Sequence, residues 1–165
     1  MKTYLMNRVN GIILIVLLTG FDQFSKYLVE QKLPFQQSEP FVPFISFYRT
    51  YNEGIAFSML NFIDNQILSI LIIAVIIFVF WMWYQSRSNA VFSQLGYMFI
   101  LAGAIGNLID RITLGHVIDF IQFHTQNWSF AVFNFADSFV TVGAALIILD
   151  EFIQIRKSNQ RSTNE

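Results

Sequence analysis

The sequence of 165 residues contains no cysteine, and only 13% of its residues are charged. Without cysteine the chain has no disulfide, no thiol nucleophile and no thiolate metal ligand, and it has no cysteine of its own to carry a lipid. Soluble domains carry charge on about a quarter of their residues. Since 55% of the residues are apolar, we expect a protein whose solvent is partly lipid.

The few charges nearly balance, with ten lysines and arginines against eleven aspartates and glutamates. This balance gives no electrostatic support for a nucleic-acid partner. No repeat or low-complexity segment is apparent, and only residues from about 158 to 165 are polar enough to predict a disordered tail. We therefore expect one integral membrane domain over residues 1–165.

Four apolar segments are long enough to cross a membrane. Residues 65–86 and 88–109 are uncharged stretches of 22 residues, each about 33 Å long as a helix at roughly 1.5 Å per residue. Two further segments contain charges only near their ends. The expected spans are about residues 9–28, 65–86, 90–109 and 133–155.

The first apolar segment has an alternative interpretation as a cleaved secretory signal, because Lys2 and Arg8 precede it. The residues that follow are poorly suited to cleavage, and Asp22 and Lys26 come directly after the segment. We expect the segment to remain as the first span.

Four spans place both termini and the loop around Arg87 on one side of the membrane. Six of the ten cations lie on that side and four on the other. The positive-inside rule then predicts cytoplasmic termini.

Several polar residues occur at span ends that meet at one membrane surface. They are Asp22 in the first span, Asn107, Asp110 and Arg111 in the third, and Asn134 and Asp137 in the fourth. Odd-numbered spans end, and even-numbered spans begin, on the same side. These residues therefore converge at one level, which is the outer surface in the predicted orientation.

The long segments on this side are rich in apolar residues. Residues 29–63 contain all three prolines and the run FISFYRTYNEGIAFS, and residues 112–132 contain HVIDFIQFHTQNWSFAVF. Aromatic and β-branched residues favour strands. We predict a small sheet with a break at residues 52–54 and an amphipathic segment on the membrane surface, with Trp128 at headgroup depth.

Asp137 begins the fourth apolar segment with no cation beside it in the sequence. An ionisable side chain within a span costs about 2.5–3.5 kcal/mol on insertion scales. A structural interpretation is available, since an acid in the first helical turn complements the helix dipole and caps free amides. Asn134, three residues earlier, would share its face.

Asp119, which lies between apolar residues in HVIDFIQF, suggests a chemical interpretation. Two carboxylates in one semi-apolar site repel each other when both are ionised, so one keeps its proton at neutral pH. The charged member can then take a proton from water while the protonated member polarises a carbonyl group, as in aspartic proteases. We predict that Asp119 and Asp137 form such a pair and titrate together.

The other polar residues at this level have less distinctive interpretations. Asp110 could be an interfacial anchor, whereas Arg111 has a fork of donors that suits a carboxylate or backbone carbonyls. Asp22 and Lys26, four residues apart, could neutralise each other while Lys26 extends outward to the interface. The two glycines of LAGAIGN favour close helix packing.

His116 and His124 raise the alternative of a metal site, with Asp119 and Asp137 as further ligands. However, the spacing matches no zinc motif, and both histidines fit surface loops. We expect neither a metal nor another cofactor.

Four motifs together resemble the ordered motif set of the bacterial lipoprotein signal peptidases, also called signal peptidase II. They are FDQFSKY (21–27), YNEGIAFS (51–58), GAIGNLIDRITLGHVIDFI (103–121) and FNFADS (133–138). The resemblance covers nearly the whole chain. It implies a mainly α-helical integral membrane fold, with four transmembrane helices, a small extracytoplasmic β-cradle and a surface helix.

The same resemblance implies an activity. Members of this family are aspartic endopeptidases of the bacterial inner membrane that cleave prolipoproteins just before the diacylglyceryl-modified cysteine, need no metal and are inhibited by globomycin. Asp119 and Asp137 would be the dyad. The supporting residues would be Asp22, Asn52, Asn107, Arg111 and Asn134. We expect lipidated substrates and membrane lipids as partners, and a monomer, since one chain contains both acids.

Two residues depart from the family pattern without touching the expected chemistry. Tyr51 precedes Asn52 where Arg or His is common, and Phe135 replaces a smaller aliphatic residue. The main alternative function is a proton-coupled transporter subunit, which would use membrane acids as a relay but would place them at several depths or near the midplane. A purely structural membrane protein has no use for two acids without obvious cations.

Overall fold

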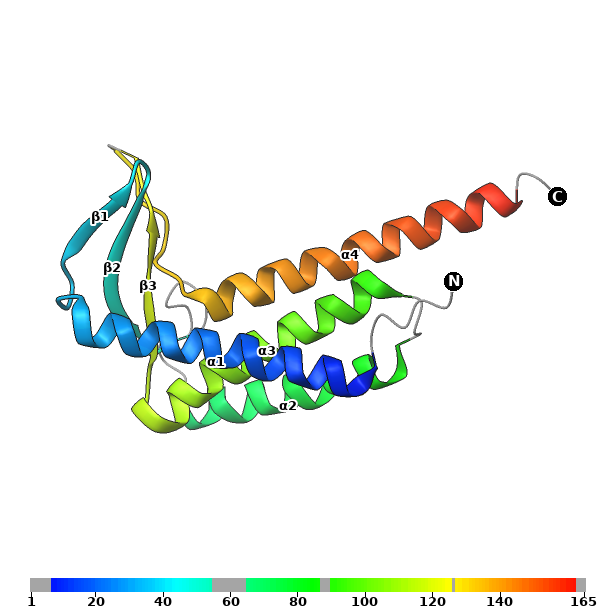
Figure 1. The fold of residues 1–165 in the computed structure, drawn as a ribbon, viewed down its shortest axis with the longest axis horizontal. Coiled ribbons are helices and arrows are strands. Elements are labelled where there is room, and N and C mark those ends of the chain that lie inside the picture. Colours follow the sequence, from blue (N-terminus) through cyan, green and yellow to red (C-terminus); the bar gives the residue numbers. More distant parts are fainter. Residues whose placement is uncertain (1–6, 55–64, 87–89, 126, 163–165) are drawn as a thin grey trace.

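The computed structural model describes residues 7–54, 65–86, 90–125 and 127–162. Long helices and a three-stranded antiparallel sheet follow one another in the order α1, β1, β2, α2, α3, β3, α4 (Figure 1). The helices run side by side, and the sheet crosses one end of the bundle (Figure 1). The predicted fold class, mainly α with a small sheet, is confirmed.

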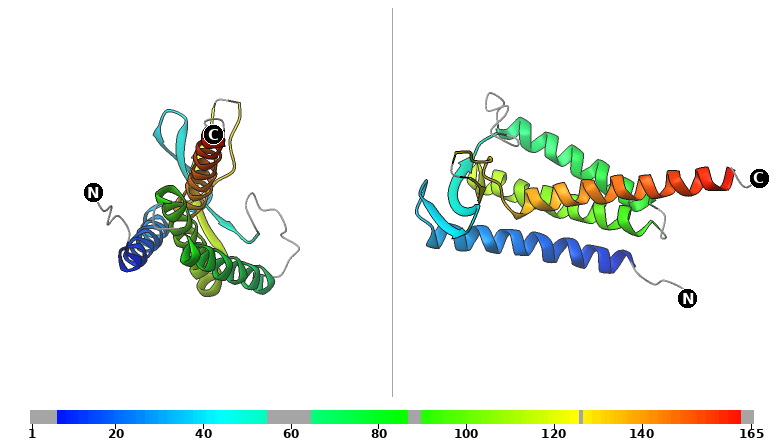
Figure 2. Two further views of the ribbon diagram at one scale, coloured as in Figure 1. Left: turned by 90° about the vertical axis from the view of Figure 1, so that its right-hand side faces the viewer. Right: turned by 90° about the horizontal axis from the view of Figure 1, so that it is seen from above.

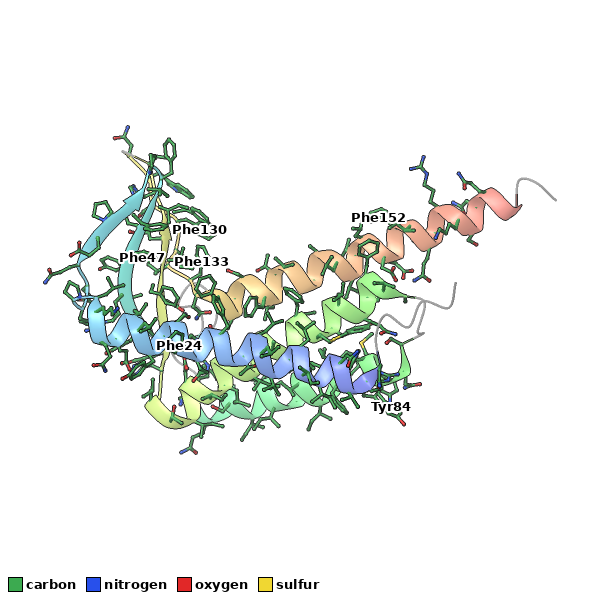
Figure 3. All side chains as sticks on the ribbon, viewed as in Figure 1. Phe24, Phe47, Tyr84, Phe130, Phe133 and Phe152 are labelled. Carbon is green, nitrogen blue, oxygen red and sulfur yellow. The ribbon has the colours of Figure 1, made fainter. Side chains whose placement is uncertain are left out.

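Each helix is long and apolar enough to cross a membrane. The helices are α1 (Arg8–Lys32), α2 (Asn65–Gln85), α3 (Val91–Leu114) and α4 (Phe135–Ser162). Their outward faces carry large apolar side chains, such as Phe24, which is 60% exposed, and Phe152, which is 68% exposed (Figure 3). Since these faces suit lipid rather than water, the chain is a multi-pass membrane protein.

The last helix is longer than the expected span. We predicted a disordered tail from about residue 158, but α4 continues to Ser162; residues 163–165 lie outside the described ranges. Residues 151–162 contain neither glycine nor proline, and each residue added to an existing helix gains a backbone hydrogen bond. Polarity therefore indicates where the apolar segment ends and not where the helix ends.

The sheet consists of β1 (Ser38–Val42), β2 (Ile45–Asn52) and β3 (Val117–Phe123), with β2 in the centre. β3 begins directly after α3, where Gly115 has a φ of 81° and its N–H bonds to the Arg111 carbonyl. This left-handed glycine ends the helix and turns the chain into the strand. The surface helix implied by the resemblance does not occur within the described ranges, which omit residues 55–64.

The central helix is α3, which packs against α1, α2 and α4 (Figure 2). At Gly103 an added Cβ would lie 2.2 Å from the carbonyl oxygen of Ala136 in α4. Only glycine permits so close an approach of two helices, as small residues commonly do in membranes. The first turn of α4 is therefore fixed directly against α3.

Candidate active site

The two acids predicted to form a pair lie where β3 and α4 meet at the sheet end of the bundle. Asp119 is in β3 and is 2% exposed. Asp137 is in the first turn of α4 and is half-buried. Ile118 and Phe120 on either side of Asp119 pack against Val29 of α1. Because side chains alternate along a strand, Asp119 points to the opposite face, where it contacts Asn52 and Asn134.

Asn134, which has no exposed surface, connects the two acids. Its Nδ2 donates to Asp119 Oδ1 at 2.7 Å, and its Oδ1 accepts from the backbone N–H of Asp137 at 2.9 Å. Nδ2 also lies 3.3 Å from the carbonyl oxygen of Ile118. One amide side chain therefore sets the position of Asp119 relative to the helix that carries Asp137.

Asn134 and Asp137 also bond reciprocally at the start of α4. Asp137 Oδ2 accepts from the backbone N–H of Asn134 at 3.3 Å, while Asn134 Oδ1 accepts from the N–H of Asp137. This arrangement is a capping box, which satisfies two free amides of the first turn. The structural interpretation of Asp137 as a helix cap is therefore correct, and the same side chain lies beside a second acid.

Amide groups from two other elements complete the surroundings of the acids. Asn107 of α3 donates through Nδ2 to Asp137 Oδ1 at 2.8 Å. Asn52, the last residue of β2, donates through Nδ2 to Asp119 Oδ2 at 3.0 Å. Every carboxylate oxygen of the pair thus accepts an N–H, which fixes both side chains without a direct ion pair.

Burial and, as a smaller effect, the nearby charge of Asp137 together raise the pKa of Asp119 from 3.8 to about 7. The hydrogen bonds from Asn52 and Asn134 act in the opposite direction but do not cancel the effect of burial. At neutral pH a large fraction of Asp119 therefore holds a proton. This is the charge state that an aspartic peptidase requires of one member of its pair.

The remaining predicted site residues hold the backbone around the pair. Arg111 is 6% exposed and donates to the backbone carbonyl of Gly54, while Asn52 Oδ1 accepts from the N–H of the same glycine at 3.0 Å. Among the described residues, Arg111 Nε and Nη1 have no hydrogen-bond partner. Asp22 Oδ1 accepts from the N–H of Ala136 at 2.9 Å and so ties α1 to the first turn of α4.

Lys26 and Asp110 differ from what the sequence suggested. Lys26 pairs with Asp22 at 2.8 Å as expected, but it is 2% exposed and does not extend to the interface. It also pairs with Asp110 at 2.9 Å, and Asp110, 2% exposed, is not an interfacial anchor. The reason is that this face of α1 packs against α3, where buried opposite charges stabilise one another.

One signal in the sequence could have revealed this cluster. Asp22 and Lys26 lie four residues apart, and a second acid, Asp110, lies at the same level of another span. The cation next to Asp110 in the sequence is Arg111, so Lys26 was available to pair with both acids. Gln23 also belongs to the cluster, since it donates to Asp110 Oδ1 at 2.7 Å. Its position beside Asp22 carried no separate signal.

The histidines do not gather with the acids. His124 Nε2 lies 2.7 Å from Ser46 Oγ, and the His116 ring stacks on Tyr51 with centroids 3.9 Å apart. Within the ranges that the structure describes, no three histidine, aspartate or glutamate side chains form a group that could hold a metal ion.

A cavity of about 240 Å³ opens beside Asp119 on the sheet. Its walls are Tyr48, Thr50, Tyr51, Asn52, Asp119, Ala131 and Val132. The wall combines polar and apolar surface, with the carboxyl and amide groups of Asp119 and Asn52 among its polar contacts. A peptide segment could therefore lie against the acid.

A family model described as Signal peptidase (SPase) II matches residues 14–153. The lipoprotein signal peptidase of Sinorhizobium fredii is 54% identical over 137 residues, which cover 83% of this chain and 82% of that protein. The lipoprotein signal peptidase of Allorhizobium ampelinum is 47% identical over 150 residues, which cover 91% and 92% of the two chains.

Two solved structures have a similar fold. One, described as "Bacterial membrane enzyme structure by the in meso method at 1.9 A resolution", has a TM-score of 0.77 and 30% identity, and covers 86% of this chain and 92% of that chain. A second, described in the same words at 2.3 A resolution, has a TM-score of 0.72 and 29% identity, and covers 90% of each chain. The matched residues contain both acids and all the amide groups that hold them, and the chain belongs to the signal peptidase II family.

Proposed function

We propose that the protein is an aspartic endopeptidase that removes the signal peptide from prolipoproteins just before the diacylglyceryl-modified cysteine. Membership of the signal peptidase II family supports this substrate. The observation that carries the chemistry is the bridge formed by Asn134, which contacts Asp119 through Nδ2 and the backbone of Asp137 through Oδ1.

In the proposed reaction the pair shares one proton. The ionised acid takes a proton from water, whose oxygen attacks the scissile carbonyl carbon, while the other acid donates its proton to the carbonyl oxygen. The C–N bond of the tetrahedral intermediate then breaks: the acid that took the water proton gives it to the amine of the lipidated cysteine, and a hydroxyl of the intermediate returns its proton to the other acid as the carboxyl product forms. Asn134, Asn107 and Asn52 keep the two carboxyl groups in place throughout.

The position of the acids suits a substrate that stays in the bilayer. The start of α1 and the end of α4 lie at the end of the bundle opposite the sheet (Figure 1). With cytoplasmic termini in the bacterial inner membrane, the pair lies near the outer surface, where the acyl chains of a lipoprotein remain in lipid while its peptide reaches the acids. We expect one chain to act alone, and globomycin to compete with the peptide.

The test is cleavage of a purified, diacylglyceryl-modified prolipoprotein in detergent, with product masses that report the cleaved bond. Wild-type protein should cleave before the modified cysteine with and without EDTA, and Asp119→Asn and Asp137→Asn should not cleave. A matched control is Asp150→Asn, which changes a buried aspartate of α4 that bonds to Ser93 and Gln154, away from the acid pair. Cleavage by either dyad variant within tenfold of the wild-type rate, or loss of wild-type cleavage in EDTA, would contradict the proposal.

A further inference from the structure

Lys26 is a buried cation that the proposed reaction does not use. Its ammonium group has three N–H donors, and all three have partners: Asp22 at 2.8 Å, Asp110 at 2.9 Å and Asn107 Oδ1 at 2.9 Å. The first two contacts balance charge. The third connects the lysine to the amide that bonds to Asp137.

This third contact, which is shorter than the 3.2 Å bond that Asn134 Nδ2 donates to the same oxygen, helps to fix which way the Asn107 amide faces. An ammonium group can only donate, so it must meet the oxygen end of the amide. The nitrogen end then points to Asp137 Oδ1 at 2.8 Å. A reversed amide would direct an oxygen at Asp137, which only a protonated carboxyl could tolerate.

The two acids therefore differ in the group that orients the amide side chain donating to each of them. Asp137 receives its side-chain hydrogen bond from an amide oriented by a full positive charge, and charge-assisted hydrogen bonds are stronger than neutral ones. The Asn52 amide, which donates to Asp119, is oriented by the neutral backbone N–H of Gly54. We infer that Lys26 is a positioning residue which, through Asn107, keeps Asp137 as the ionised member of the pair and leaves the proton on Asp119.

For the ionisation of Asp137, the orientation of the Asn107 amide matters more than the net charge of the surrounding groups. The groups that face Asp137 are Asp22 and Lys26 of α1, Asp110 and Arg111 of α3, and Asp119 of β3. The two acids Asp22 and Asp110 balance the two cations Lys26 and Arg111, so the net charge of these four groups does not by itself favour another anion. The oriented N–H of Asn107, together with the backbone N–H of Asn134, offers Asp137 favourable contacts.

The inference rests on the proposed function, and a charge-matched double variant tests it. Lys26→Met with Asp110→Asn removes the charged donor to Asn107 Oδ1 and leaves the neutral Asn134 Nδ2 at 3.2 Å. The formal charge of Asp22, residue 26 and residue 110 together stays at minus one. Asp110→Asn alone is the control, because it keeps the contact between Lys26 and Asn107. Both variants are compared with wild type for kcat and KM on a lipidated peptide between pH 5 and pH 9.

The double variant should lose about tenfold in kcat at acidic pH, the effect expected when a charge-assisted hydrogen bond is removed. The ratio of its kcat to that of wild type should rise with pH, because at alkaline pH Asp137 ionises even without the contact between Lys26 and Asn107. KM should change less than twofold. Asp110→Asn should keep the wild-type profile on the acidic side. Lys26→Gln with Asp110→Asn, which restores a neutral N–H donor, should regain part of the lost kcat.

A constant ratio across the pH range would overturn the inference, since a purely structural defect lowers kcat equally at every pH. Unfolding of both double variants while Asp110→Asn stays folded would overturn it too, because Lys26 would then be needed for folding alone. If wild type cleaves and Asp119→Asn does not, a flat ratio rejects only the role of Lys26. If wild type does not cleave, the proposed function fails first and this inference with it.

Discussion

Asp137 has two roles in the structure, a helix cap and a member of the acid pair, and two substitutions separate them. Asp137→Asn keeps an oxygen that can accept from the Asn134 N–H, so the capping box survives while the charge and the acceptor for Asn107 Nδ2 are lost. Asp137→Ala removes both the cap and the charge. The two variants should therefore be equally inactive but unequally stable.

The expected magnitudes follow from these contacts. Loss of a general base lowers kcat by about 10²–10⁴-fold, and this applies to both variants. Loss of a capping contact costs about 0.5–2 kcal/mol, and roughly 2–4 °C of Tm corresponds to each kcal/mol in a chain of this size. We expect Asp137→Asn to unfold close to the wild-type temperature and Asp137→Ala to unfold a few degrees lower.

The assays are cleavage of the lipidated substrate and thermal unfolding in the same detergent. Asp137→Asn with cleavage within tenfold of wild type would refute the assignment of Asp137 to the chemistry. If Asp137→Asn were as unstable as Asp137→Ala, the amide oxygen would have failed to replace the carboxylate as acceptor. This result would refute the stabilising role assigned to the capping box.

The other predictions concern proton binding and packing. Because the pKa of Asp119 is about 7, cleavage should decline as pH rises through about 7; activity that still increases above pH 8 would contradict this. The raised pKa also means that the folded chain binds more protons than the unfolded chain between about pH 4 and pH 7, so the free energy of unfolding should fall as pH rises through that window. Asn52→Ala removes the donor to Asp119 Oδ2, so the pKa should rise and the alkaline decline should move to higher pH; an unmoved decline would argue against this contact. Gly106→Ala should cost about 1–3 kcal/mol, since its Cβ would lie 2.6 Å from Asp22 Oδ2. At Gly20 a Cβ would meet nothing within 4 Å, so Gly20→Ala should leave Tm unlowered or slightly raised, because alanine favours the helix.

The sequence was most informative about features that depend on residue type and short-range spacing. The expected β-rich segments became β2 and β3, and the break expected at residues 52–54 coincides with the end of β2 at Asn52. Asn134 and Asp137, three residues apart, meet at the start of α4 as helical spacing requires. These features depend on local pattern, which a single sequence contains.

The sequence was least informative where the outcome depended on which neighbour a side chain meets. Lys26 could equally have reached water, and its burial follows from the contact of α1 with α3. Likewise, nothing in the pattern indicated that Asn134 would bond to Asp119 across 15 residues of chain. Such contacts are set by the rotation of each helix about its axis, which hydropathy leaves free.

By itself, the sequence determined that the chain crosses a membrane and that its polar residues gather at one level, because the free energy of placing a residue in lipid depends on that residue and its depth. The tertiary structure decided which polar groups touch. Close packing at Gly103 fixes α4 against α3, and this contact brings Asn107 to Asp137 and leaves Lys26 buried behind it. Because a hydrogen bond requires its donor and acceptor to lie about 3 Å apart, only the packed arrangement of the helices determines which polar groups bond to each other.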